Sequence, residues 1–157
     1  MSQSDYIKKH VDEIMSDDNY PYPLNMAMAA SWICGNFKAV NLKVLDLTEM
    51  SSLADYFVLA SATNTTMAKS ISDEVSAQLK KHGANVLSKE GSHQDTDWIL
   101  IDLGDIIIHI FQEMSRDIYD LDNLWSKAPR VTIPNEYYMS DDAADKAASN
   151  KDDLDYF

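Results

Sequence analysis

The sequence predicts an α/β protein, more narrowly α+β, with a mixed β-sheet of about five strands flanked by helices. Two observations support this prediction. Short apolar runs rich in strand-forming residues alternate with longer segments of helical periodicity. Their order along the chain, α-β-β-α-β-β-β-α, places several strand-like runs next to one another without an intervening helix. This order implies a mixed sheet with helices packed against it.

The first predicted elements are a helix and two strands. Residues 24–37 are rich in Ala and Met and predict a helix, with Gly35 near its C-terminal end. Residues 43–48 and 56–60 are short apolar runs of strand-forming residues, joined by a turn over 51–55.

A second helix is predicted over residues 65–82, because apolar side chains recur there at every fourth position and Gly83 is placed to end the helix. These apolar side chains are Met67, Ile71, Val75 and Leu79. Residues 85–89 could form a third strand, and residues 115–125 predict a last helix. No internal repeat is present.

Residues 97–111 hold the clearest local signal, two apolar runs that meet at Gly104-Asp105 as in a β-hairpin. If these are the two turn residues, the pairing runs outward to Trp98 opposite Phe111. Alternate side chains then point to opposite faces of the hairpin. One face is entirely aliphatic and is expected under the helices; it consists of Ile99, Ile101, Leu103, Ile106, Ile108 and Ile110.

The other face of this hairpin mixes aromatic, aliphatic and ionisable side chains: Trp98, Leu100, Asp102, Ile107, His109 and Phe111. A solvent face would be polar, and a second core face would not carry Asp102 and His109. The mixture is typical of the centre of a protein–protein interface. The alternative is that a helix or a second subunit covers this face, and a one-residue slip in register would exchange the two faces.

The chain is strongly acidic, with 26 acidic and 13 basic residues and a net charge of −13. This balance argues against nucleic-acid binding through a basic patch and favours a basic partner. The excess lies at the ends: residues 1–20 carry 5 acids and 2 bases, and residues 135–157 carry 7 acids and 2 bases. We expect an N-terminal extension over 1–20, a domain over 21–128 and an acidic, flexible tail over 129–157. A short helix could form at residues 5–16.

The remaining bulk features predict a cytoplasmic protein without a membrane anchor. The first residues lack the apolar core of a signal peptide, and no apolar run approaches the roughly 18 residues of a membrane helix. The single cysteine, Cys34, lies among Met, Ala and Trp, and we expect it to be a small buried hydrophobe.

Few residues suggest catalysis. Asp95 and Asp97 have the D-x-D spacing that could hold a divalent metal ion, and Asp102 and Asp105 follow closely. A metal-dependent nucleotidyltransferase would also need a Gly-rich phosphate turn, and residues 61–66, where it would lie, contain no glycine. The four histidines show no metal-ligand spacing. We therefore expect no catalytic residue, metal or cofactor, and assign Asp95 and Asp97 to capping a loop and a strand end.

Residues 24–125 resemble the iojap/ribosomal silencing factor (RsfS) family. The matching segments are residues 44–47, 51–58, 90–91, 97–98, 102–110, 112–113, 116, 119–121 and 124–125. The chain departs from the family pattern at Ala62, where the family usually has Gly, and over residues 63–67. The first 20 residues and the segment after Pro134 are expected to lie outside the resemblance.

The resemblance implies a nucleotidyltransferase-like fold without known catalysis. It also implies binding to ribosomal protein number fourteen of the large subunit, with little nucleic-acid contact. The bound factor would block joining of the small subunit and repress translation when nutrients are short. Family members can be homodimers when free.

The contact residues that we expect from this resemblance and from the mixed hairpin face are Trp98, Leu100, Asp102, Asp105, His109 and Phe111. Tyr119, Leu124 and Trp125 have helical spacing and are expected to pack in the core. The alternatives are a divergent metal-dependent nucleotidyltransferase-like enzyme and an acidic adaptor that acts through its tail.

Overall fold

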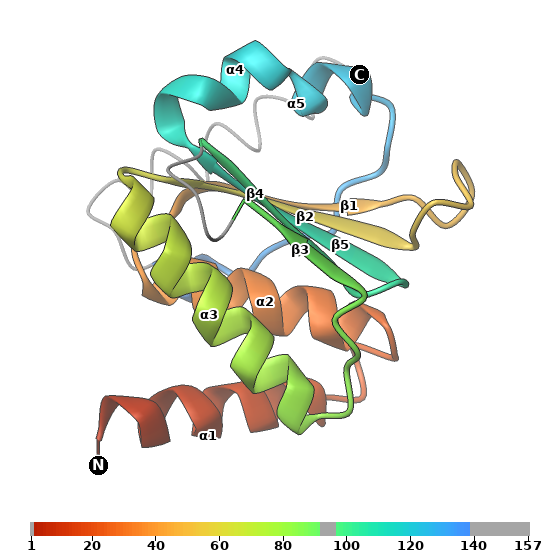
Figure 1. Ribbon diagram of the computed structural model, residues 1–157. Helices are drawn as coiled ribbons and strands as arrows, with labels where there is room; N and C mark the ends of the chain where they lie inside the picture. Colours follow the sequence, from red (N-terminus) through yellow and green to blue (C-terminus); the bar gives the residue numbers. More distant parts are fainter. Residues whose placement is uncertain (1, 92–96, 139–157) are drawn as a thin grey trace.

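The computed structural model describes residues 2–91 and 97–138. A five-stranded sheet has helices on both faces (Figure 1). The longer helices α1 (Gln3–Met15), α2 (Leu24–Asn36) and α3 (Thr65–Lys81) lie on one face, called here the helical face. The short helices α4 (Arg116–Tyr119) and α5 (Leu121–Leu124) lie on the other, the second face. The predicted fold class, a mixed sheet flanked by helices, is confirmed.

The strands are β1 (Val40–Asp46), β2 (Tyr56–Ala62), β3 (Ser88–Glu90), β4 (Trp98–Asp102) and β5 (Ile106–Gln112). Their order in the sheet is β1-β2-β5-β4-β3. The pair β2 and β5 is parallel, and the other three pairs are antiparallel. The third strand, expected over 85–89, is shorter and begins later than predicted.

The β4–β5 hairpin has the predicted register. Trp98 pairs with Phe111, and the pairing runs inward to Asp102 and Ile107. The Leu103 N–H donates a hydrogen bond to the Ile106 carbonyl at 3.0 Å, which leaves Gly104 and Asp105 as the turn residues. Gly104 has φ +87°, a left-handed conformation that glycine adopts without strain.

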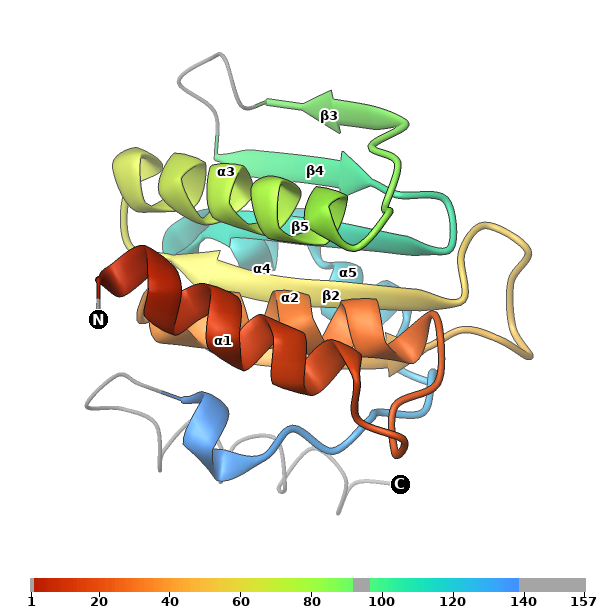
Figure 2. The same cartoon turned by 90° about the horizontal axis from the view of Figure 1, so that it is seen from below.

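The helical face carries the main core. Every aliphatic hairpin residue expected under the helices is buried there, together with apolar residues of all three helices. Helix α3 begins at the predicted Thr65, after Asn64, whose side chain accepts a hydrogen bond from the Met67 N–H. It ends just before Gly83, as its spacing predicted. Helix α2 is buried almost all round because α1 lies outside it, as Figure 2 shows from below.

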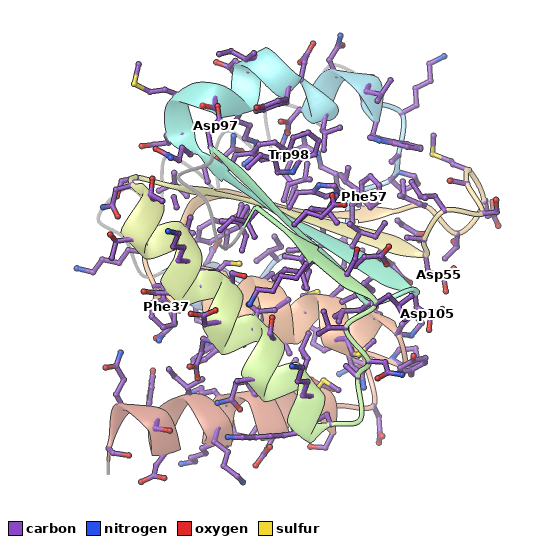
Figure 3. The ribbon with its side chains drawn as sticks, in the orientation of Figure 1. Phe37, Asp55, Phe57, Asp97, Trp98 and Asp105 are labelled. Atoms are coloured by element: carbon purple, nitrogen blue, oxygen red, sulfur yellow. The ribbon has the colours of Figure 1, made fainter. Side chains whose placement is uncertain are left out.

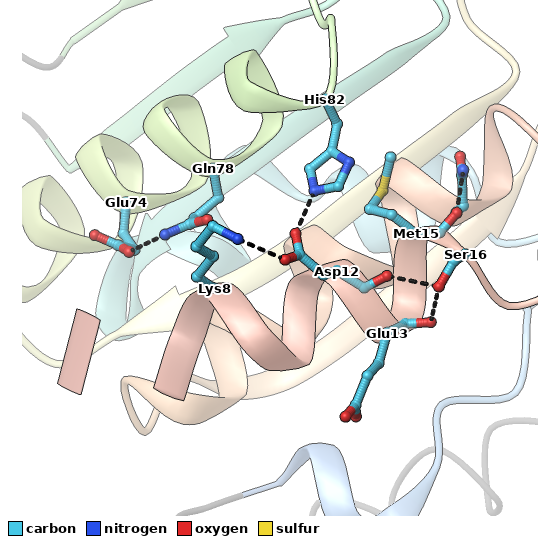
Figure 4. Close-up of polar contacts among 9 residues, drawn as sticks. Lys8, Asp12, Glu13, Met15, Ser16, Glu74, Gln78 and His82 are labelled. Carbon is cyan, nitrogen blue, oxygen red and sulfur yellow. Dashed lines mark hydrogen bonds and ion pairs between the residues drawn. The ribbon is translucent and has the colours of Figure 1, made fainter. Parts of the chain in front are cut away.

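Helix α1 packs on the domain through three buried residues on one side, Ile7, Val11 and Ile14. Polar contacts join it to α3. The Asp12 carboxylate accepts hydrogen bonds from Lys8 Nζ at 2.8 Å and from His82 Nε2 at 2.9 Å (Figure 4). The short helix expected near residues 5–16 is therefore present, and it contributes to the core.

The segment after α5 crosses from the second face to the helical face around the edge of β1. The Asp46 N–H donates to the Pro129 carbonyl at 2.8 Å, and the Val131 N–H donates to the Val44 carbonyl at 2.9 Å. The chain then forms a 3₁₀ turn, η2 (Asn135–Tyr137), and buries Tyr137 in the main core.

Tyr138 is buried in the same core as Tyr137. The Tyr137 carbonyl oxygen lies 1.8 Å from where a Cβ on Gly35 would stand, so the chain can pass α2 only because residue 35 is glycine. The core therefore includes residues on both sides of the range 21–128.

The predicted last helix over 115–125 is wrong as a single element. A 3₁₀ turn, η1 (Glu113–Ser115), leads into α4, and Asp120, with φ +56°, separates α4 from α5. A residue in the left-handed conformation cannot continue an α-helix. The two helices are therefore single turns that change direction at Asp120.

Two smaller expectations concern the whole chain. Cys34 is fully buried as predicted, and burial raises the pKa of its thiol to about 12. Within residues 2–91 and 97–138, no helix has the length and apolar character to span a bilayer.

A candidate protein-binding surface on the second face

The second face of the sheet carries a cluster of six aromatic rings. We call it the aromatic cluster; it consists of Phe57, Trp98, His109, Phe111, Tyr119 and Trp125. Trp98 stacks on Phe111 at a centroid distance of 5.2 Å and contacts Tyr119 at 4.7 Å. Phe57 meets the edges of His109 at 4.7 Å and Trp125 at 5.4 Å. The rings join the sheet to the two short helices that cover it.

His109 is a neutral, buried member of this cluster. Its side chain is 3% exposed, and Trp98 Nε1–H donates a hydrogen bond to its Nδ1 at 3.2 Å. Burial, and next the positive charge of Arg116, lower the pKa of His109 to about 4. Because Nδ1 accepts, the ring proton is on Nε2, for which the described part of the chain offers no partner. This arrangement fixes the orientation of the Trp98 indole.

A buried ion pair attaches the two short helices to the sheet. Arg116 is 2% exposed, and its guanidinium donates to both carboxylate oxygens of Asp122 at 2.9 Å. The same guanidinium donates to Ser61 Oγ at 3.0 Å and to the Asn41 carbonyl. Lys43 Nζ lies 2.7 Å from Asp122, and the two cations hold the pKa of this carboxyl well below its usual range despite its burial. The path of α4 and α5 is therefore fixed by charge as well as by apolar contact.

The six expected contact residues do not form one surface. His109 and Phe111 are buried by the chain itself, Trp98, Leu100 and Asp102 are partly exposed, and Asp105 is exposed. For the centre of this face, the structure therefore matches the alternative in which helices cover it. Trp98 itself remains partly exposed. Figure 3 shows this residue next to α4 and α5, the helices that cover this face.

The two acidic positions lie toward the other end of the hairpin. Asp102 is four residues along β4 from Trp98, or roughly 13 Å at the usual rise per residue. Its carboxylate accepts a hydrogen bond from the Gly104 N–H at 2.8 Å, and Asp105 accepts one from the Tyr22 hydroxyl at 2.7 Å. Figure 3 shows Asp105 beside Asp55, away from Trp98. Asp102 and Asp105 thus have local roles in and around the turn.

The structure also shows exposed apolar residues that the sequence patterns did not reveal. Met114 is 90% exposed, Ile118 78% and Leu124 71%, and Tyr119 is also exposed. Core packing of Tyr119 and Leu124, expected from one continuous helix, is therefore wrong, whereas Trp125 does pack against Phe57. The break at Asp120 changes which side chains point inward. We call Met114, Ile118, Tyr119 and Leu124 the exposed apolar group.

The candidate metal-binding acids have other contacts. Asp97 accepts a hydrogen bond from the Tyr119 hydroxyl at 2.8 Å, which lowers the pKa of this carboxyl. Asp95 lies outside the described residues. No group of three His, Cys, Asp or Glu side chains within residues 2–91 and 97–138 is placed to hold a metal ion.

Comparisons with known proteins agree with the architecture. Residues 22–155 match the family model "Ribosomal silencing factor during starvation" (RsfS). The match continues well beyond Pro134, where we expected the resemblance to end. The chain is 33% identical over 110 residues to the ribosomal silencing factor RsfS of Bacillus subtilis, covering 70% of this chain and 90% of that protein. It is 24% identical over 142 residues to the chloroplastic protein Iojap of Zea mays, covering 83% of this chain and 60% of that one.

A solved structure from Bacillus halodurans is also similar, with a TM-score of 0.59 and 28% sequence identity, covering 70% of this chain and 96% of the other. The family model covers most of the chain, and the Bacillus subtilis relative aligns over nearly its whole length. This chain belongs to the RsfS family of ribosomal silencing factors.

Proposed function

We propose that this protein binds the large ribosomal subunit through ribosomal protein number fourteen and so prevents the small subunit from joining. The bound factor would repress translation by occupying space, without catalysis. The observation that carries the proposal is the exposed apolar group, whose member Tyr119 contacts Trp98, on a chain whose relatives are named ribosomal silencing factors. Exposed apolar side chains gathered on one segment are typical of a protein-binding surface.

Trp98 and Leu100 are the central contacts in this proposal. Trp98 is partly exposed, and its ring is held by Phe111, Tyr119 and the hydrogen bond to His109. Ordering an aromatic side chain before binding reduces the entropy lost on association. His109 and Phe111 therefore contribute from beneath, by orienting Trp98, and the exposed apolar group extends the contact over α4 and α5.

Charge supports a basic partner. The chain carries a net charge of −13, and the partly exposed Asp102 and the exposed Asp105 add negative charge at the turn end of the same hairpin. Complementary charge accelerates association and selects among partners more than it raises affinity. Asp102 and Asp105 are thus peripheral contacts in the proposal, and Trp98 is the anchor.

The test is co-sedimentation of the full chain with purified large ribosomal subunits. We expect Trp98→Ala to weaken binding by ~2 kcal/mol or more, about thirtyfold, as truncation of an aromatic anchor commonly does. The double variant Ile118→Ala/Leu124→Ala should also bind more weakly. The matched control is Met50→Ala/Leu53→Ala, which removes two exposed apolar side chains from the loop between β1 and β2.

The two pairs of variants separate the outcomes. Failure of the wild type to sediment with large subunits would contradict the proposed function. Equal binding by wild type, Trp98→Ala and Ile118→Ala/Leu124→Ala would leave ribosome binding in place but move it to another surface. A joining assay with both ribosomal subunits, followed on sucrose gradients, then tests whether the bound factor reduces the yield of whole ribosomes.

In the free protein, we propose that two copies bury this same surface in a homodimer. Dimerisation and ribosome binding would then exclude each other. Analytical ultracentrifugation should show that Trp98→Ala shifts the chain toward the monomer, and unchanged association in that variant would contradict a dimer on this surface.

A further inference from the structure

A separate cavity lies on the helical face, between α1, α2 and the segment that carries η2. Its volume is about 250 Å³. Figure 2 shows that these elements lie on the same side of the sheet, and α4 and α5 lie on the opposite side. The cavity therefore does not belong to the candidate protein-binding surface.

The walls of this cavity are aromatic. Trp32 and Tyr137, both buried, line it together with His10 and Tyr20. The His10 ring stacks on Trp32 with a centroid distance of 4.9 Å and an angle of 6° between the planes. His10 Nδ1 lies 3.1 Å from the Tyr6 carbonyl, which can only accept, so Nδ1 is the donor in this contact.

Glu13, Asp17 and Glu136 add three carboxylates to the lining, and Ile14 and Pro134 also line the cavity. Among the residues that the structure describes, no lysine or arginine lines it. Burial, and next the neighbouring Tyr20, raise the pKa of the Tyr137 hydroxyl, and the negative charges of Glu136 and Asp17 add to this rise. The negative charges come from two segments more than a hundred residues apart in the chain. They converge on the cavity because residues 129–138 cross to the helical face.

We propose that this cavity binds an organic cation, the guanidinium or ammonium group of a basic side chain or of a free polyamine. Aromatic faces attract such cations, and the partly exposed Tyr20 is the ring that can offer one, because Trp32 and Tyr137 are almost fully buried. The carboxylates supply charge-assisted hydrogen bonds. The volume is smaller than the roughly 300–1,000 Å³ of sites for drug-sized ligands, so it suits a single side chain or a thin alkylamine. An anion would meet three negative charges there and is excluded.

The cavity and the proposed ribosome-binding surface lie on opposite faces of the sheet, so both can be occupied at once. A basic side chain held in the cavity would give the protein a second contact to a partner. The site is distinct from the exposed apolar group in chemistry as well as in position, since it recognises charge.

The test follows the indole N–H signals of the full chain by ¹⁵N NMR. Trp32 lines the cavity, whereas Trp98 and Trp125 lie on the second face and serve as internal references. The ligands are a tripeptide, N-acetyl-Gly-Arg-Gly-amide, and spermidine, with the corresponding glutamate tripeptide as the negative ligand. We expect both cations to shift the Trp32 signal and leave the other two in place.

The variant Glu13→Gln/Asp17→Asn removes two charges and keeps the size of each side chain, and the amide of residue 17 still accepts from the Asn19 N–H. Loss of charge-assisted hydrogen bonds should weaken the affinity for both cations, measured from the Trp32 signal, by about tenfold or more. The matched control, Glu49→Gln/Glu113→Gln, removes two exposed acids outside the cavity and should respond like the wild type.

Tighter binding of the arginine tripeptide would identify a protein side chain as the ligand. Tighter binding of spermidine would identify a free polyamine as the ligand. The proposal is overturned if neither cation shifts Trp32, or if all three indoles shift alike. It is also overturned if Glu13→Gln/Asp17→Asn binds as well as the control.

Discussion

The two faces of the β4–β5 hairpin are both apolar, but they are covered in different ways. On the helical face, its isoleucines lie beneath α2 and α3, of 13 and 17 residues, and the 13-residue α1 packs outside α2. On the second face, the covering helices α4 and α5 have four residues each. Arg116 and Asp122 hold this thin cover in place, and its outer side retains Met114, Ile118 and Leu124 in contact with solvent.

The two faces of the sheet therefore serve different purposes, one for stability and one for binding. The helical face buries nearly all of its apolar surface within the chain, and that burial supports stability. The second face buries His109 and Phe111 but keeps Trp98 partly exposed, in contact with the exposed Tyr119. Because an ion pair fixes α4 and α5 on the sheet, these helices can expose apolar side chains and still keep their position. A binding surface needs side chains that are ordered in this way before the partner arrives.

The largest effect should come from comparing neighbouring isoleucines on the two faces. Ile108 is fully buried under the long helices, and Ile107 packs on the second face. We expect Ile108→Ala to lower the free energy of unfolding by about 4 kcal/mol and Ile107→Ala by about 2 kcal/mol, because the thin cover can relax into the space left by Ile107. Urea denaturation measures both, and equal losses would show that the two covers are equally rigid.

Removing the ion pair should weaken the second face alone. In Arg116→Gln, Asp122 keeps Lys43 but loses its bidentate partner, and the expected loss is about 3 kcal/mol. Hydrogen exchange should accelerate over α4 and α5 and remain slow in α2. Uniform acceleration in all three helices would contradict a role confined to the cover.

Acidification should also act through the second face. His109 has a pKa of about 4 in the folded chain and an ordinary value of 6.5 when unfolded, so the unfolded chain binds more protons between these values. Its contribution to stability is therefore complete above about pH 6.5 and is lost as the pH falls toward 4. At pH 5 the loss is about 2 kcal/mol.

The control for this prediction is His109→Phe, which removes the titrating group and keeps a ring in the aromatic cluster. Unfolding free energies at pH 7.5 and 5 should fall more steeply with acid in the wild type than in the variant. Equal pH slopes in the two proteins would refute the assignment to His109.

The smallest effect is expected from truncation after Tyr138. Residues 139–157 are polar and strongly acidic, so we expect their removal to change the unfolding free energy by less than about 0.5 kcal/mol and to leave ribosome binding intact. Truncation after Pro134 should be costly because it removes the buried Tyr137 and Tyr138. Loss of ribosome binding after truncation at Tyr138 would favour an adaptor that acts through its tail.

Local patterns predicted the helical face well and the second face poorly. The hairpin register followed from Gly104-Asp105 and strict alternation, both of which are local signals. The break at Asp120 has no comparable signal. It accompanies tertiary contacts of Arg116 with Ser61 and Asn41, far away in the chain, and such contacts override helical periodicity.

The candidate surface was predictable only in part for the same reason. Trp98 and Leu100 were placed correctly on the second face, but burial of His109 and Phe111 depends on where α4 and α5 lie. The buried tyrosines 137 and 138 were missed because polar residues and prolines surround them, so no periodic pattern marks them. Gly35 lies near the C-terminal end of α2 as predicted, but its second role, to admit the Tyr137 carbonyl, had no sequence signal.

The crossing segment also protects the sheet from uncontrolled self-association. An edge strand with free N–H and C=O groups can template pairing with another chain. Here Pro129 and Val131 hydrogen-bond to β1, and Arg130 forms a β-bridge with Leu45, so this edge already has a partner. The opposite edge is β3, which is only three residues long. A protein that exposes apolar side chains on one face thus closes or shortens the edges through which strand addition and aggregation would begin.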